Sequence, residues 1–140
     1  MLIRTTSAGE HECVTQEQHA LQSGLLAGAW SPTPLSAMLT LTIGLHDAPR
    51  RGSDRRPMLN AVTGLPYDFL DYPKASKFAL YGAGIDALED VHPYVAYMVS
   101  RHYTTFAGTK GADELQVPQA ARTAPGLGRS TVAWVAVKGR

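Results

Sequence analysis

Hydrophobic and polar residues form a short β-type pattern at the start of the chain and helical periods after it. Leu2–Thr5 and His11–Val14 are rich in strand-favouring residues, and Ser7-Ala8-Gly9-Glu10 between them is typical of a turn. The pattern predicts a small β-hairpin. Because a two-stranded hairpin of this size is marginal alone, it must pack on the elements that follow.

The first helix is predicted from Thr15 to about Trp30. Thr15 and Gln18 have the spacing of a capping box, in which the threonine hydroxyl accepts from the Gln18 amide and the Gln18 side chain reaches back. Leu21 and Leu25 are one turn apart and share a face of this helix.

A second helix is predicted to begin after a proline-rich break. Thr33 suits its N-cap and Pro34 its first helical position. Apolar residues cover much of its girth, which favours a place in the middle of a bundle. Pro49 is expected to end this helix, because the residue before a proline avoids the helical conformation. His46 and Asp47 would then lie in its last turn.

After Pro49 the pattern of apolar and polar residues predicts a long loop and then two more helices. Residues 50–72 are rich in Gly, Pro, Arg and Asp and predict a loop, and long loops within a compact domain are often functional. A third helix follows Pro73 and runs to about Leu88, and a fourth begins at Pro93. The apolar stripe of the fourth helix contains Val95, Met98, Val99, His102 and Phe106.

The predicted fold is mainly α, a helical bundle with a small N-terminal β-hairpin and an irregular C-terminal tail. A chain of 140 residues suits a single domain. We place the helical domain at residues 1–107 and the tail at residues 108–140, where Gly and Pro recur without a helical period. Residues 130–137 fit a strand or an apolar patch in the tail, and the pattern leaves both open.

Charge is nearly balanced along the chain. The sequence has 13 Lys and Arg against 12 Asp and Glu, which argues against binding to nucleic acid or to an anionic membrane surface. A basic cluster, Arg50, Arg51, Arg55 and Arg56, lies in the predicted loop beside Asp47 and Asp54. We expect this cluster to be solvated.

The sequence favours a cytoplasmic location. Its first residues lack the apolar region of a signal peptide, and no run reaches the roughly 18 apolar residues of a membrane span. Cys13 is the single cysteine, so an intrachain disulfide cannot form, which fits a reducing compartment.

His19 and the doublet His46-Asp47 are the residues most able to carry chemistry. Imidazole nitrogens and a carboxylate are the usual ligands of a catalytic divalent metal. An aspartate in the last turn of a helix also faces the negative end of the helix dipole, at a cost of about 0.3–1 kcal/mol that a bound cation would remove. A doublet is a short motif, however, and Asp47 could equally solvate a helix end.

Several segments resemble, in order, a bacterial family of unknown function, domain of unknown function 3891. These segments are Met1–Arg4, Val14–Ala20, Leu45–Asp47, Gly64–Phe69 and Pro93–His102. The resemblance extends to about residue 106. The family is distantly similar to the HD-domain superfamily of metal-dependent phosphohydrolases, which adds an HD-like bundle to the expected fold. The resemblance also implies that His19, His46 and Asp47 hold a divalent metal ion (Mn, Fe or Zn).

The chain departs from the pattern of both groups. Ala48-Pro49 follows the doublet where the family tends to have Gly-Trp. An HD-type site also takes a further aspartate from a later helix, and the candidates here are Asp68, Asp86 and Asp90.

Other residues are candidates for completing the site. His102 fits a further metal ligand or a hydrogen-bonded core histidine. Asp47 and Arg101 are the candidate catalytic residues. The Arg101 guanidinium suits a bidentate phosphate clamp or a surface ion pair.

The sequence leaves two functional interpretations open. One is a metal-dependent phosphohydrolase, or a relic of one, acting on a phosphorylated small molecule. The other is a non-catalytic helical binding or oligomerisation domain, or a truncated fragment of a larger protein. In the second interpretation the face of Val95, Met98 and Val99 lacks cover, and large exposed apolar patches favour a homo-oligomer.

Overall fold

Helices make up most of the described chain, and a small antiparallel hairpin precedes them, as the sequence predicts. The computed structural model describes residues 1–112, with side chains through Thr105. The elements are β1 (Leu2–Thr5), β2 (His11–Val14), α1 (Gln16–Trp30), α2 (Ala37–Leu45), the 3-10 helix η1 (Ala48–Arg50), α3 (Arg51–Arg55), α4 (Lys74–Glu89) and α5 (Pro93–Ala112). Helix α5 thus extends past residue 107, and the strand considered at residues 130–137 lies outside the described residues.

The hairpin and the start of α1 follow local sequence signals. Strand β1 pairs with β2 so that Leu2 lies opposite Val14. The Thr15 hydroxyl oxygen accepts from the Gln18 amide at 3.1 Å, and Gln18 Oε1 accepts from the Thr15 amide at 3.4 Å. The predicted capping box is therefore confirmed, and it fixes where α1 begins.

The bounds of α2 differ from the prediction at both ends. Ser36, and not Thr33, is the N-cap, and its hydroxyl accepts from the Leu39 amide at 3.2 Å. Helix α2 ends at Leu45, and Pro49 lies in the first turn of η1. The predicted end at Pro49 was wrong because proline is also well suited to the first turn of a new helix.

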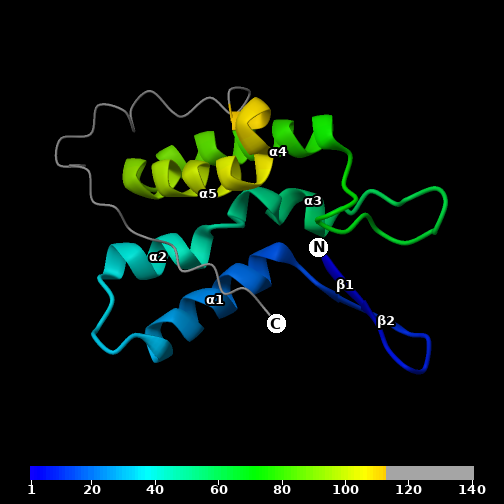
Figure 1. Cartoon of the computed structure of the whole chain (residues 1–140), viewed down its shortest axis with the longest axis horizontal. Coiled ribbons are helices and arrows are strands. Elements are labelled where there is room, and N and C mark those ends of the chain that lie inside the picture. Colours follow the sequence, from blue (N-terminus) through cyan, green and yellow to red (C-terminus); the bar gives the residue numbers. More distant parts are fainter. Residues whose placement is uncertain (113–140) are drawn as a thin grey trace.

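Two helix pairs form the body of the molecule. Helices α1 and α2 pack together on one side, α4 and α5 pack together on the other, and α2 contacts α5 between them (Figure 1). The buried core lies at the α4–α5 pair and contains Tyr81, Ile85, Leu88, Val95, Ala96, Val99 and Tyr103.

This packing corrects two expectations about apolar surfaces. Helix α2 lies between α1 and α5, but it is less buried than its apolar girth suggested, since Thr42 alone is buried among its residues and Leu41 is exposed. The face of Val95, Met98 and Val99 is buried, because α4 covers this part of α5. The expected lack of cover on that face was therefore wrong.

A glycine in α4 brings η1 against this helix. A Cβ built on Gly84 would lie 2.2 Å from Cβ of Pro49 and 2.4 Å from its Cα. A side chain at position 84 would therefore collide with η1. The Gly82-Ala83-Gly84 segment belongs to a continuous helix and is tightly packed at Gly84.

Part of the basic cluster is buried, contrary to the expectation of a solvated loop. Arg50 is only 1% exposed, and its guanidinium lies over the Tyr72 ring at 4.4 Å from the centroid. Nη2 of Arg50 lies 4.0 Å from the buried Asp54 carboxylate. Asp54 also accepts from the Met1 amine at 3.1 Å and from the Gln16 amide, so it ties α3 to the start of α1.

The loop predicted over residues 50–72 is shorter in the structure, because η1 and α3 occupy its first part. Residues 56–73 connect α3 to α4, with one bridge between Leu59 and Pro66. None of the helices within residues 1–112 has both the length and the apolar character needed to cross a membrane.

Candidate metal centre

The fold brings His19, His46 and Asp47 together. His19 lies on α1, and His46 and Asp47 follow the end of α2. One ligand atom from each of the three residues lies within 4.8 Å of the other two. The packing of α1 on α2 therefore joins the residues that the sequence separated, and the cluster could hold a metal ion.

A backbone carbonyl sets the orientation of the His46 ring. Nδ1 of His46 lies 2.7 Å from the Ile43 carbonyl oxygen, which can only accept, so Nδ1 carries the proton. Nε2 faces Oδ2 of Asp47 at 3.3 Å. Burial lowers the pKa of His46, but the hydrogen bonds to Asp47 and Ile43 outweigh this and hold it above its usual value.

Asp47 is a buried carboxylate held by several donors. It is 5% exposed, its Oδ1 accepts from the Tyr103 hydroxyl at 3.1 Å, and its Oδ2 accepts from Gln16 Nε2 at 3.3 Å. Burial raises the pKa of Asp47, but the hydrogen bond and charge of His46 outweigh burial and hold it below its usual value. The group is therefore ionised near neutral pH and suits a metal ligand.

The donor set fits a divalent transition metal. Two imidazole nitrogens and one carboxylate oxygen suit Zn, Fe or Mn, and three protein ligands leave positions for water and substrate. Oε1 of Gln16 is buried beside the cluster and has no hydrogen-bond partner within the described part of the chain. A donor such as a metal-bound water would satisfy this orphaned oxygen.

The cluster lies in the wall of a cavity of about 380 Å³. His102 lines this cavity, and its ring centroid is 4.9 Å from that of His46. Burial, together with the charge of His46, lowers the pKa of His102 to about 4, so its imidazole is neutral near pH 7. His102 does not belong to the group of three converging ligands, although it faces the same cavity.

Lys77 is a cationic residue of this cavity that was not among the candidates from the sequence. It lies on α4, lines the cavity and donates to the Phe69 carbonyl oxygen at 2.6 Å. Burial lowers the pKa of Lys77, and the charge of Arg50 adds to this. The pattern of α4 offered one signal, a lysine directly before the apolar Phe78 that packs against the core.

The other sequence candidates lie elsewhere. Arg101 is exposed and does not line the cavity. Asp86 and Asp90 are exposed, and neither joins the cluster. Asp68 accepts from the amides of Leu70 at 2.6 Å and Asp71 at 2.9 Å, so it caps a turn.

Two further residues of the site were not predicted. Tyr103, expected to be a packing aromatic, also donates to Asp47 while its ring stacks on Tyr81 at 3.8 Å between centroids. Gln16 lies three residues before His19 and hence on the same face of α1. That spacing was the available signal for Gln16, whereas the contact of Tyr103 depends on how α5 packs.

Comparison with known proteins identifies the family of the chain but assigns no activity to it. Neither a curated protein nor a solved structure matches the chain significantly. The match to the family extends well beyond residue 106, where the sequence analysis placed its end. Since the model for proteins of unknown function DUF3891 matches residues 1–124, the chain belongs to the DUF3891 family.

Proposed function

We propose that the chain is a divalent-metal-dependent phosphohydrolase whose metal is held by His19, His46 and Asp47. The observation that carries the proposal is the convergence of three ligand atoms within 4.8 Å at the wall of a cavity. The proposal agrees with the resemblance to HD-domain phosphohydrolases. We take Mn, Fe or Zn as the ion and a cytoplasmic phosphorylated small molecule as the substrate.

The ion and two further residues of the cavity, His102 and Lys77, are assigned roles in this proposal. When bound, the ion supplies Lewis acidity, which lowers the pKa of a water and neutralises charge on a phosphoryl oxygen. The imidazole of His102 stays neutral near pH 7 and adds a polar side chain to the lining of the same cavity. Lys77, rather than Arg101, binds the phosphoryl group, because its ammonium has donors beyond the one used by Phe69.

Metal analysis of the purified chain tests the proposal. Wild-type protein should hold about one equivalent of a transition metal, and His46→Asn should hold much less. His92→Asn is the matched control, because His92 is exposed at the start of α5 and lies outside the cavity lining. Equal, substoichiometric metal in all three proteins contradicts the proposal.

Activity is tested separately on the metal-loaded chain. Hydrolysis of an aryl phosphate should depend on the ion and fall at least about tenfold in Lys77→Gln, which keeps its metal. An unchanged rate in Lys77→Gln removes that residue from the proposed site. Metal binding without hydrolysis would mean that the chain is a degenerate relic of such an enzyme.

A second candidate function is self-association through α1. Leu25 is 76% exposed and Trp30 is 81% exposed, and Leu21 and Leu26 are also exposed. A Cβ added to Gly28 would meet nothing within 4 Å. Leu21, Leu25 and Gly28 share one face of α1, and this face has exposed apolar side chains beside open space that a second copy of the chain could occupy.

Sedimentation of two leucine variants tests the second candidate. Wild-type protein should sediment as a dimer at micromolar concentration, and Leu25→Ser should shift it toward the monomer. Leu59→Ser is the control, because Leu59 is exposed on the loop before α4. A monomeric wild type excludes this candidate.

A further inference from the structure

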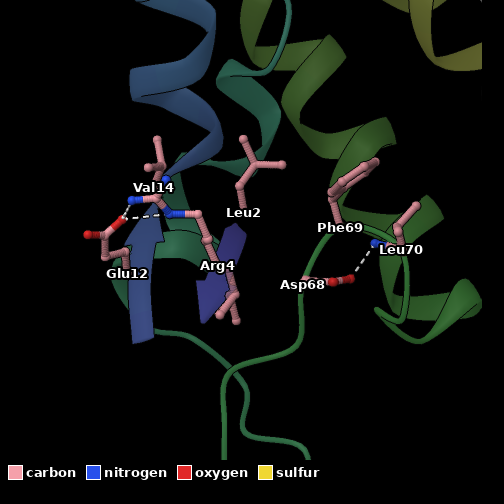
Figure 2. A pocket seen from close by; sticks show the side chains of 8 residues that line it. Leu2, Arg4, Glu12, Val14, Asp68, Phe69 and Leu70 are labelled. Carbon is pink, nitrogen blue, oxygen red and sulfur yellow. Dashed lines mark hydrogen bonds and ion pairs between the residues drawn. The ribbon is translucent and has the colours of Figure 1, made fainter. Parts of the chain in front are cut away.

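A second cavity, of about 430 Å³, lies between the hairpin and the turn that precedes α4. Figure 2 shows Leu2 and Val14 on the strands at one side and Phe69 and Leu70 on the turn at the other. These four apolar side chains line the cavity. None of its lining residues is one of the three candidate metal ligands, His19, His46 and Asp47.

The second cavity adjoins the metal cavity. Leu2, Phe69 and Leu70 line both of them. The three side chains therefore lie where the two cavities meet. A ligand that extends from the three candidate metal ligands past these side chains would enter the second cavity.

The three charged side chains that line the second cavity each have a partner within the described part of the protein. Nε of Arg4 donates to Oε2 of Glu12 at 2.9 Å, and Nη2 of Arg4 contacts the same oxygen. Oδ1 of Asp68 accepts from the backbone amides of Leu70 and Asp71. Figure 2 shows the Arg4–Glu12 pair and the hydrogen bond from Leu70 to Asp68.

This lining decides the chemistry of an occupant. A sugar or a second phosphate would need several donors, and Arg4, the cation among the described lining residues, already contacts Glu12, while most of the lining is apolar. An uncharged apolar group, by contrast, would bury its surface against Leu2, Val14 and Phe69 without losing a hydrogen bond.

We propose that the second cavity binds the apolar alcohol portion of a phosphate ester whose phosphoryl group lies at the metal cluster. This inference rests on the proposed function and narrows its substrate class. The substrate is then an ester of an uncharged alkyl or aryl alcohol, whereas a nucleotide or sugar phosphate would bind poorly.

Phosphonates test the proposal, because their carbon–phosphorus bond is not hydrolysed. Metal-loaded wild-type protein should bind phenylphosphonate at least about tenfold more tightly than methylphosphonate, measured by calorimetry. Leu70→Ser should reduce this ratio to about threefold or less. Val14→Ser, at a residue that lines the second cavity but not the metal cavity, should reduce the ratio in the same way. It should leave the metal content and the affinity for methylphosphonate unchanged, and these two readouts also show that this variant is folded.

Leu59→Ser is the matched control. Leu59 is 59% exposed and Leu70 is 72% exposed, both lie between α3 and α4, and Leu70 alone of the two lines the cavities. Leu59→Ser should keep the wild-type ratio. If Leu70→Ser does not fold, Val14→Ser decides alone, since Val14 is a partly exposed residue on the hairpin side of the second cavity.

The outcomes separate this inference from the proposed function. Equal affinities for the two phosphonates in metal-loaded wild-type protein overturn the inference and leave the metal site intact. An unchanged ratio in both Leu70→Ser and Val14→Ser overturns it as well. Wild-type protein that binds no metal contradicts the proposed function itself, and with it the inference.

Discussion

Asp47 keeps its charge inside the protein because donors from three directions surround it. Tyr103 comes from α5, Gln16 from the first turn of α1, and His46 from the adjacent position. A buried carboxylate without such partners would be protonated. The same donors fix the direction of the carboxylate, as the outer contacts of metal ligands commonly do.

Removing one of these donors should weaken metal binding. In Tyr103→Phe the ring can still stack on Tyr81, but Oδ1 of Asp47 loses the hydroxyl at 3.1 Å. The pKa of Asp47 should rise, and the dissociation constant for the metal should increase at least about tenfold, as titration with Zn²⁺ would show. Tyr97→Phe, on the same helix but outside the cavity lining, should bind like wild type. Equal affinities for all three proteins contradict this role for Tyr103.

His102 should make metal-free stability depend on pH. Its folded pKa of about 4 lies below its usual value of 6.5, so between these values the unfolded chain takes up a proton that the folded chain does not. Stability should therefore fall as pH is lowered from 6.5 to 4, by on the order of 3 kcal/mol from this group. Urea denaturation of wild type and His102→Gln across this range measures it. Parallel stability curves for the two proteins would exclude the effect.

The predictable part of the site is the part encoded locally. His46 and Asp47 are adjacent in sequence, and the carbonyl that orients His46 belongs to Ile43, within the same helix. Lys77 and Tyr103 reach the cavity only because α4 and α5 pack against η1 and α2. No spacing along the chain encodes that approach, so the lysine directly before Phe78 was the one signal for Lys77, and Tyr103 had none.

At the scale of elements, η1 connects the three candidate metal ligands to α4. Asp47 lies directly before η1, and Pro49 within it fits against Gly84. A loop was predicted from residue 50 onward because Gly, Pro, Arg and Asp are frequent there, and the basic cluster was expected to be solvated. The burial of Arg50 over Tyr72 comes from the tertiary fold, which composition does not report. Caps, by contrast, depend on neighbouring residues, and the predicted starts of α1 and α5 are confirmed.

Two glycines of α4 should respond in opposite ways to alanine. Gly84→Ala would place a Cβ within 2.4 Å of the backbone of Pro49, and this overpacking should cost about 1–3 kcal/mol of unfolding free energy. Gly82→Ala meets nothing within 4 Å and should gain up to about 1 kcal/mol, because alanine favours the helix. Chemical denaturation measures both. If Gly84→Ala were as stable as Gly82→Ala, the close contact would be absent.

At the scale of the whole molecule, a metal at the cluster would join parts of the chain that the bundle holds only by packing. His19 belongs to α1, while Asp47 follows α2 and contacts α5 through Tyr103. Because the unfolded chain does not keep these ligands together, the ion should bind the folded state preferentially. The family match over residues 1–124 includes all three ligands.

Metal should therefore raise the melting temperature of the full chain. At a free concentration 100 times the dissociation constant, one bound ion adds about 2.7 kcal/mol of stability, which corresponds to a rise in Tm of roughly 5–10 °C. A chelator should reverse the rise. His46→Asn should show little response. His92→Asn should respond like wild type, because the exposed His92 lies directly before α5, away from the three candidate ligands. A rise of equal size in His46→Asn would mean that the ion binds somewhere other than this cluster.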